Sequence, residues 1–274
     1  MVYKILCLSQ LNIFIFDSGI GGLSIYNFIK NKFQNINFIY LLDNAYFPYG
    51  NKSKSFIQKR LLKILFNVSY KYNITLAIIG CNTASVSSLP YIRRYFNFPI
   101  IGISPMFDKA IKTTKNNVIG IIATNTTINN VHIQKKINLI NTNRQYLILS
   151  LASQRLVYFA EQKITGKNNS IKILYDIFNT WYHLPVFPDS IILGCTHFLF
   201  IKDELKKIFP IHTIFIDSNH EVLLQLQKII QPTSQKYHLQ KNIFLYTKKT
   251  LKIKCLKDYI HDIGFHFSTK IKLI

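Results

Sequence analysis

The chain has 274 residues, 49% of them hydrophobic, and a formal net charge of +22 from 34 basic and 12 acidic side chains. This length and hydrophobic share predict a folded protein with room for two domains and exclude a disordered chain. No apolar run reaches the roughly 18 residues of a membrane helix. Polar Ser9, Gln10 and Asn12 interrupt the apolar start, so we expect no membrane span and no export signal. We therefore expect a cytoplasmic protein whose four cysteines stay reduced.

The positive charge by itself leaves a nucleic-acid partner open. The lysines are scattered, however, and no nucleic-acid-binding motif accompanies them. The chain is also rich in Lys, Asn, Ile, Phe and Tyr, a composition that compositional drift alone can produce. We interpret the charge as compositional and expect no nucleic-acid partner. No Cys-x-x-Cys pair and no His/Cys cluster with metal-ligand spacing occurs, so we expect no metal.

Short apolar runs alternate with amphipathic segments along the chain. The runs are mostly continuous, as in parallel strands that are buried on both faces. We predict strands at residues 12–16, 38–42, 74–79, 99–103, 118–123, 146–151, 190–193 and 213–216. We predict helices at residues 53–72, 154–162, 202–208 and 221–230. This alternation predicts an α/β fold with mostly parallel sheets.

The chain also reads as two similar halves. In each half a strand ends in a polar turn, at Asp17 or at Thr124, and a later strand ends in Gly-Cys. An Asp-Ser pair at residue 217 follows a further strand, which suggests a return to the first half. We predict one α/β domain from residues 1–103 plus 217–274 and a second from residues 104–216. The two domains would be pseudo-symmetric, with the active site in the cleft between them. The segment after Gln231 is basic and has strand patterns at 242–246 and 265–271. The sequence does not predict where these strands lie in the fold.

Two cysteines in matching contexts are the sharpest chemical signal. Cys81 lies in Ile-Ile-Gly-Cys-Asn-Thr-Ala-Ser and Cys195 in Ile-Leu-Gly-Cys-Thr-His. A buried strand that ends in Gly-Cys brings a thiol to the carboxyl edge of a sheet, where open α/β folds bind ligands. Two such thiols suit the removal of a proton from one face of a carbon and its return on the other. Asp17 is a candidate proton partner for Cys81, and His197 or Glu161 for Cys195.

Other readings of these residues stay open at this point. A free cysteine is often a small buried hydrophobic residue, and Cys195 with His197 also fits a Cys-His hydrolase. Residues 17–23 read Asp-Ser-Gly-Ile-Gly-Gly-Leu, which allows a ligand to approach the backbone closely or simply forms a structural turn. The Pro-Tyr-Gly turn at 48–50 can direct backbone N–H groups at a carboxylate or pack as a plain loop. Cys7 and Cys255 lack such contexts, and we interpret both as structural or incidental.

The ordered set of motifs resembles the glutamate racemase family over residues 12–225. The motifs are Phe-Asp-Ser-Gly-Ile-Gly-Gly-Leu-Ser, Asp-Asn-Ala-Tyr-Phe-Pro-Tyr-Gly-Asn-Lys-Ser, Gly-Cys-Asn-Thr-Ala-Ser, Ile-Gly-Ile-Ile-Ala-Thr-Asn-Thr-Thr and Leu-Gly-Cys-Thr-His-Phe. The stretch around Glu161 is most similar to the proteobacterial branch. The resemblance implies a cofactor-independent enzyme that interconverts L- and D-glutamate and supplies D-glutamate for peptidoglycan. It also implies two α/β domains with the active site in the cleft between them.

The resemblance also implies roles for individual residues. Cys81 and Cys195 would be the two acid/bases, assisted by Asp17 and by His197 with Glu161. Residues expected to hold the amino and α-carboxylate groups are Asp17, Ser18, Asn82, Thr83, Thr127 and Thr196. The turn of Pro48, Tyr49 and Gly50 would receive the side-chain carboxylate. No pyridoxal motif is visible to delocalise a carbanion, in keeping with the absence of a cofactor in the family.

The chain departs from the family pattern at four positions outside the proposed catalytic groups, namely Thr126, His132, Leu199 and Asn219. These departures concern loop geometry, and an enzyme with reduced catalytic activity remains an alternative. Some proteobacterial members are activated by UDP-N-acetylmuramoyl-L-alanine, which makes that compound a candidate partner. An aspartate racemase-like enzyme and a DNA- or gyrase-binding homologue are the alternatives. Both a monomer and a homodimer are compatible with the sequence.

Overall fold

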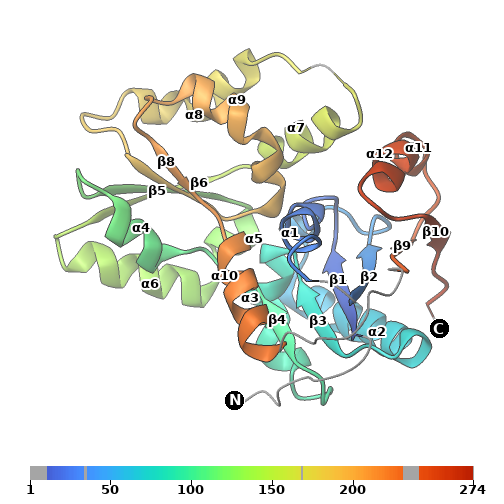
Figure 1. Cartoon of the computed structure of the whole chain (residues 1–274). Coiled ribbons are helices and arrows are strands. Elements are labelled where there is room, and N and C mark those ends of the chain that lie inside the picture. The colour runs from blue at the N-terminus through green and yellow to red at the C-terminus, as the bar shows by residue number, and fades with distance from the viewer. Residues whose placement is uncertain (1–10, 34–35, 168, 231–240, 274) are drawn as a thin grey trace. The chain divides into compact units, whose positions relative to one another are not determined.

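The computed structural model describes residues 11–33, 36–167, 169–230 and 241–273 (Figure 1). Its contacts divide the chain into two compact units. The first unit is Met1–Ile103 with Asn219–Ile274, and the second is Ser104–Ser218. In the described part of the chain, no helix combines the length and the apolar character needed to cross a membrane.

The first unit is built on a parallel sheet with the strand order β10-β9-β2-β1-β3-β4. Its strands are β1 (Leu11–Asp17), β2 (Ile36–Leu42), β3 (Leu76–Ile79), β4 (Ile100–Gly102), β9 (Ile243–Tyr246) and β10 (Phe267–Lys270). Its helices are α1 (Leu23–Ile29), η1 (Tyr49–Asn51), α2 (Lys54–Tyr72), α3 (Asn82–Ile92), α10 (Asn219–Ile229), α11 (Leu251–Cys255) and α12 (Lys257–Asp262).

The core of this unit follows from the apolar runs of the central strands. Every residue of β2 and β3 is buried, as expected for strands that are covered on both faces. Helix α2 adds Ile57, Leu61 and Leu65 to the same core, and each such side chain contributes about 1.5–3 kcal/mol on burial. The Ser53 hydroxyl accepts the Phe56 N–H and so begins α2, and Asn73 ends it in the left-handed region at φ 46°.

The second unit is built on a parallel sheet with the strand order β6-β5-β7-β8. Its strands are β5 (Val118–Ala123), β6 (Leu147–Ala152), β7 (Ser190–Leu193) and β8 (Ile214–Ile216). Its helices are α4 (Phe107–Thr113), α5 (Asn125–Ile128), α6 (Val131–Thr142), α7 (Gln154–Ile164), α8 (Lys172–Tyr182), η2 (Thr196–Ile201) and α9 (Lys202–Ile208). Burial alternates along the edge strand β6, unlike the continuous burial of β5 and β7.

The two sheets repeat one topology. The order β2-β1-β3-β4 in the first unit corresponds strand for strand to β6-β5-β7-β8 in the second. A hydrogen bond repeats as well. The Gly80 N–H donates to the Phe16 carbonyl at 2.8 Å, and the Gly194 N–H donates to the Ile122 carbonyl at 2.8 Å. The units are thus pseudo-symmetric, and each Gly-Cys pair occupies the same place in its own sheet.

The C-terminal segment extends the first sheet. Strand β9 pairs with β2, and β10 pairs with β9 (red end of the colour bar, Figure 1). The Phe244 ring stacks on Tyr40 with the centroids 5.3 Å apart, and Asn242 accepts the Phe38 N–H. Both expected strand patterns of this segment are present, at 243–246 and 267–270, with α11 and α12 between them. Cys255 is exposed, whereas Cys7 and the start of the segment, 231–240, lie outside the described residues.

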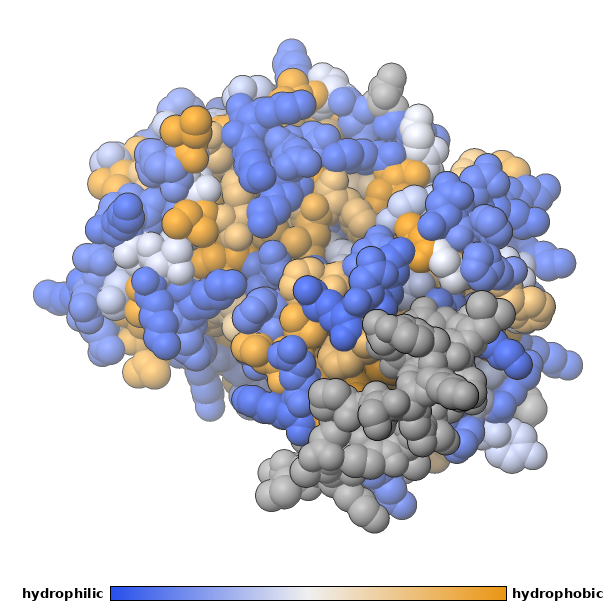
Figure 2. All heavy atoms as spheres, in the orientation of Figure 1, coloured by the Kyte–Doolittle hydropathy of each residue, from blue (hydrophilic) through white to orange (hydrophobic). Residues whose placement is uncertain are grey.

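The described surface is predominantly polar on the face shown in Figure 2, where hydrophilic side chains (blue) surround scattered hydrophobic ones (orange). Exposed hydrophobic residues come from different elements, for example Tyr70 of α2, Leu139 of α6 and Leu251 of α11. Single exposed hydrophobic residues of this kind are ordinary in folded proteins. They do not by themselves identify a partner surface.

Candidate active site

Three adjacent strands bring polar groups to the carboxyl edge of the first sheet. Asp17 ends β1, Asp43 follows β2 and Cys81 follows β3 one residue after Gly80. Because β2, β1 and β3 are parallel neighbours, their ends meet at one edge. Gly80 allows this approach, since a Cβ there would lie 3.2 Å from the Phe16 carbonyl oxygen and 3.3 Å from an Ile25 methyl group. The Cys81 thiol is thus held at the N-terminus of α3, with 7% of the residue exposed.

A serine hydroxyl links the first thiol to a buried carboxylate. The Ser18 Oγ lies 3.4 Å from Asp17 Oδ1, to which it donates, and 3.7 Å from Cys81 Sγ. Asp17 Oδ1 also accepts the Gly19 N–H at 3.1 Å, and Asp17 is fully buried. Since an ionised carboxylate only accepts hydrogen bonds, the Ser18 oxygen is left to accept from the thiol. The arrangement connects Cys81, Ser18 and Asp17 in a row along which a proton can be stabilised.

A buried tyrosine, Tyr40, contacts the glycine-rich turn at this edge. Burial raises the pKa of Tyr40 well above its ordinary value, and the charges of Asp17 and Cys81 raise it further. Tyr40 therefore stays protonated, and its hydroxyl donates to the Gly19 carbonyl at 2.9 Å. Gly22 lies against both groups, because a Cβ there would be 3.1 Å from the Tyr40 oxygen and 3.1 Å from Asp17 Cβ. The glycine-rich turn thus fits closely around Asp17.

The first turn of α3 presents buried polar groups beside Cys81. Asn82 and Thr83 are each 3% exposed. Among the described residues, the Asn82 Oδ1 atom is buried and has no hydrogen-bond donor. A buried amide oxygen without a donor costs roughly 1–3 kcal/mol. Asn82 is therefore suited to accept a hydrogen bond from a cationic or N–H-bearing ligand.

The Pro-Tyr-Gly turn is fixed by a buried ion pair. The Tyr49 hydroxyl donates to Asp43 Oδ2 at 2.7 Å, and Arg60 donates to both oxygens of Asp43 at 2.9 and 2.7 Å. Thr247 of the C-terminal segment donates to Asp43 Oδ1 at 2.7 Å. Burial and then Asp43 raise the pKa of Tyr49 well above its ordinary value. The Phe47–Pro48 peptide bond at the start of the turn is cis.

In the second unit, a histidine connects the other thiol to a carboxylate. Cys195 follows β7, and its sulfur lies 3.5 Å from His197 Nδ1. His197 Nε2 lies 2.7 Å from Oε1 of Glu161, which comes from α7, and both side chains are buried. An ionised Glu161 can only accept, so we assign the ring proton to Nε2, which leaves Nδ1 to take the proton of the thiol. The row of Cys195, His197 and Glu161 suits a thiol that must lose and regain a proton.

Three threonines complete the edge of the second sheet. Thr124 follows β5 and caps the start of α5. Its hydroxyl accepts the Thr127 N–H at 3.3 Å and contacts the Thr127 hydroxyl at 3.0 Å. Thr127 is fully buried, and Thr196, next to Cys195, is 3% exposed. The second edge therefore resembles the first, with buried hydroxyl groups on both sides of a thiol.

Glu161 gives the first testable expectation. Glu161→Gln keeps the size of the side chain but removes the charge that stabilises a protonated His197. The glutamate racemisation that the family resemblance implies should then slow about 10- to 100-fold. Since the two enantiomers have equal free energy, kcat/KM should fall equally in both directions. The matched control is Glu204→Gln, at a half-buried glutamate that pairs with Lys163 and belongs to neither thiol row. Activity of Glu161→Gln within twofold of wild type would show that the carboxylate does not act through His197.

Sequence reasoning did not identify several residues that shape these edges. Arg60, Tyr40 and Thr247 are not among the predicted site residues, and Asp43 appears only as the first residue of the Asp-Asn-Ala-Tyr-Phe-Pro-Tyr-Gly motif. The four departures from the family pattern lie in α5 (Thr126), α6 (His132), η2 (Leu199) and the start of α10 (Asn219). None of them belongs to the two thiol rows described above.

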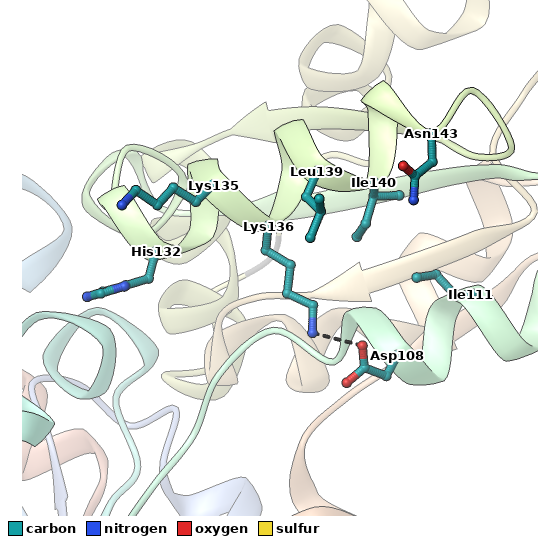
Figure 3. A pocket seen from close by; sticks show the side chains of 8 residues that line it. All are labelled: Asp108, Ile111, His132, Lys135, Lys136, Leu139, Ile140 and Asn143. Carbon is teal, nitrogen blue, oxygen red and sulfur yellow. Dashed lines mark hydrogen bonds and ion pairs between the residues drawn. The ribbon is translucent and has the colours of Figure 1, made fainter.

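A surface pocket of about 550 Å³ lies on the second unit (Figure 3). Its walls come from α4 and α6, and Lys136 bridges them by an ion pair with Asp108 at 2.8 Å. His132 and Lys135 lie along the α6 wall. The pocket shares no residue with the thiol rows and is a separate feature of this unit.

Two of the three comparisons with known proteins find relatives of this chain. No model of a known protein family matches the chain. Glutamate racemase of Buchnera aphidicola subsp. Schizaphis graminum (strain Sg) is 42% identical over 262 residues, which cover 94% of this chain and 99% of the relative. Glutamate racemase of Pectobacterium atrosepticum is 36% identical over 266 residues, covering 97% of this chain and 93% of the relative.

The structural comparison points the same way. The crystal structure of Escherichia coli glutamate racemase in complex with L-glutamate and the activator UDP-MurNAc-Ala matches with a TM-score of 0.87 and 31% identity, covering 97% of this chain and 99% of that one. Two α/β units with parallel sheets, together with these relatives, define an amino-acid racemase. The chain belongs to the glutamate racemase family.

Proposed function

We propose that the chain interconverts L- and D-glutamate by a two-base mechanism in which Cys81 and Cys195 act on opposite faces of Cα. The observation that carries the proposal is that each thiol heads its own buried proton-accepting row, Ser18 and Asp17 for Cys81, and His197 and Glu161 for Cys195. A racemase that works on both enantiomers needs two such groups, because each base must become the acid of the reverse reaction.

The steps balance without a cofactor. In the L-to-D direction, the Cys195 thiolate takes the Cα proton, and the electron pair of the C–H bond moves toward the α-carboxylate. The Cys81 thiol then gives its proton to the other face of Cα, which leaves Cys81 as a thiolate and Cys195 as a thiol. The D-to-L direction reverses the roles. The mechanism requires both thiols in the reduced form, which fits a cytoplasmic location.

The substrate groups have matching partners in each unit. The Asn82 oxygen suits the substrate ammonium, because it is buried and is left without a donor in the described part of the chain. Thr83, Thr127 and Thr196 supply buried hydroxyl groups for the α-carboxylate, where negative charge grows as the proton leaves. The turn of Pro48, Tyr49 and Gly50 would receive the side-chain carboxylate through its backbone N–H groups.

The relatives favour glutamate over the alternatives. The two relatives described above are glutamate racemases that the chain matches over 99% and 93% of their length. Neither an aspartate racemase nor a DNA- or gyrase-binding role is favoured. We propose that the product D-glutamate serves peptidoglycan synthesis and that UDP-N-acetylmuramoyl-L-alanine activates the enzyme. The E. coli structure with that activator supports the second point.

The test is racemisation of L-glutamate by the purified chain, followed as loss of optical rotation, with and without the UDP-linked compound. We expect loss of rotation toward zero, faster when the compound is present, and no comparable loss with L-aspartate. Retention of rotation under both conditions would contradict the proposed activity. Racemisation at the same rate with and without the compound would contradict activation alone.

A further inference from the structure

The C-terminal segment places one lysine at the edge that carries Asp17. Lys252 lies in α11, which begins after Thr250, whose hydroxyl accepts the Ile253 N–H. The strand before this helix, β9, is the direct neighbour of β2 in the sheet. Because β9 is parallel to β2, the residues that follow β9 emerge at the same edge as Asp43 and Asp17.

Hydrogen bonds fix this part of the segment to the loop that follows β2. Asn44 Oδ1 accepts the backbone N–H groups of Thr247 and Lys248 at 3.1 and 2.9 Å, and Asn44 Nδ2 donates to the Lys248 carbonyl at 2.7 Å. The Ala45 N–H donates to the Thr247 hydroxyl, which in turn donates to Asp43. The residues before α11 are therefore held in register with the start of the Pro-Tyr-Gly loop.

The Lys252 side chain lies against that loop. Its Nζ is 4.7 Å from the centroid of the Phe47 ring, a cation–π distance, and Phe47 immediately precedes the Pro-Tyr-Gly turn. Burial lowers the pKa of Lys252 to about 8, whereas the charge of Asp17 acts to raise it. Asp43, the other acid at this edge, is bound by Arg60. Lys252 is half-buried, is affected by the charge of the fully buried Asp17, and is mostly protonated at neutral pH.

The net charge at the sheet edge that carries Asp17 suggests a role for Lys252 in substrate binding. Glutamate carries two carboxylates and one ammonium group, so it brings a net negative charge to an edge that already holds Asp17. Backbone N–H groups of the turn offer neutral hydrogen bonds, whereas a half-buried ammonium offers a charge-assisted one. We propose that Lys252 is a substrate-binding residue that pairs with the side-chain carboxylate of glutamate beside the Pro-Tyr-Gly turn. This inference rests on the proposed function.

The test compares three variants by steady-state racemisation of L-glutamate. Lys252→Met removes the charge and keeps the apolar stem, Lys252→Arg keeps the charge, and Lys254→Met removes an exposed charge from the same helix. At pH 7 we expect Lys252→Met to raise KM about tenfold or more with kcat changed much less. Lys252→Arg should stay close to wild type, and Lys254→Met should be unchanged.

The pH dependence of KM separates this role from a purely structural one. The ammonium form predominates below a pKa of about 8, so the KM of wild type should rise as the pH passes from 7 to 9. Lys252→Arg does not titrate there and should lack that rise. Titration of the thiols and of the substrate is common to all variants, so the difference between wild type and Lys252→Arg isolates the lysine.

Either of two results would overturn the inference. One is a KM of Lys252→Met within twofold of wild type. The other is an equal pH dependence of KM in wild type and Lys252→Arg. A failure of the proposed function looks different, since wild type itself would then not racemise glutamate. Thermal melting of each variant checks that the first unit remains folded, and Lys252→Arg supplies the binding result if the Met variant does not fold.

Discussion

Replacing either Cys81 or Cys195 by serine is expected to reduce racemisation of glutamate by roughly 10³-fold or more. A serine hydroxyl at either place is far less acidic than a thiol and cannot carry the charge of the base. Ser18 and Asp17 form one row with Cys81, and His197 and Glu161 form a separate row with Cys195. One intact row therefore cannot compensate for the loss of the other. The measurement is kcat/KM in both directions by circular dichroism.

The matched control for these variants is Cys255→Ser. Cys255 is exposed, whereas Cys81 and Cys195 are each 7% exposed, so its replacement should leave activity unchanged. Thermal melting checks that the two buried substitutions do not unfold the protein. If either single-thiol variant kept activity within tenfold of wild type, the assignment of two bases would be wrong.

Arg60→Met is expected to destabilise the first unit by about 3–5 kcal/mol, because it leaves the charge of Asp43 buried without its cationic partner. Asp43 is fully buried, and Arg60 holds both of its oxygens. Burial alone would lower the pKa of Arg60, but the hydrogen bonds and charge of Asp43 raise it above its ordinary value. Urea unfolding followed by circular dichroism measures the loss.

The control for this variant is Arg94→Met, which removes an exposed arginine of the same unit and should change stability by less than about 0.5 kcal/mol. Because Tyr49 also binds Asp43, we further expect Arg60→Met to raise KM for glutamate through the Pro-Tyr-Gly turn. Equal stability of the two variants would show that the Asp43 pair contributes little.

The periodicity of the sequence predicted the sheets well for a physical reason. Strands such as 118–123 and 190–193 are buried on both faces, so they must be continuously apolar, and both have the predicted bounds. The other predicted strands and helices are present with their ends shifted by no more than two residues. The sequence also predicted that Asp17 and Cys81 lie at a common edge, because each follows or ends a buried strand and adjacent parallel strands end at the same edge of a sheet.

The parts that sequence reasoning left open depend on contacts between distant residues. Thr247 binds Asp43 across a separation of 204 residues, and no local pattern records that β9 inserts next to β2. Arg60 lies within the predicted helix at 53–72, and only the fold brings Asp43 to it. The Ser18 hydroxyl lies between Asp17 and Cys81, whereas the sequence suggested a direct partnership of the carboxylate and the thiol.

Isotope incorporation during early turnover in deuterated water tests the two-base claim most directly. The chain is incubated with L-glutamate, and the two enantiomers are separated and analysed for deuterium at Cα. Two separate thiols predict that the first D-glutamate formed carries deuterium while the remaining L-glutamate keeps its hydrogen, because the proton removed by one thiol is not the one that the other delivers. Deuterium that appears equally early in the recovered L-glutamate, or D-glutamate that retains the original hydrogen, would contradict the account.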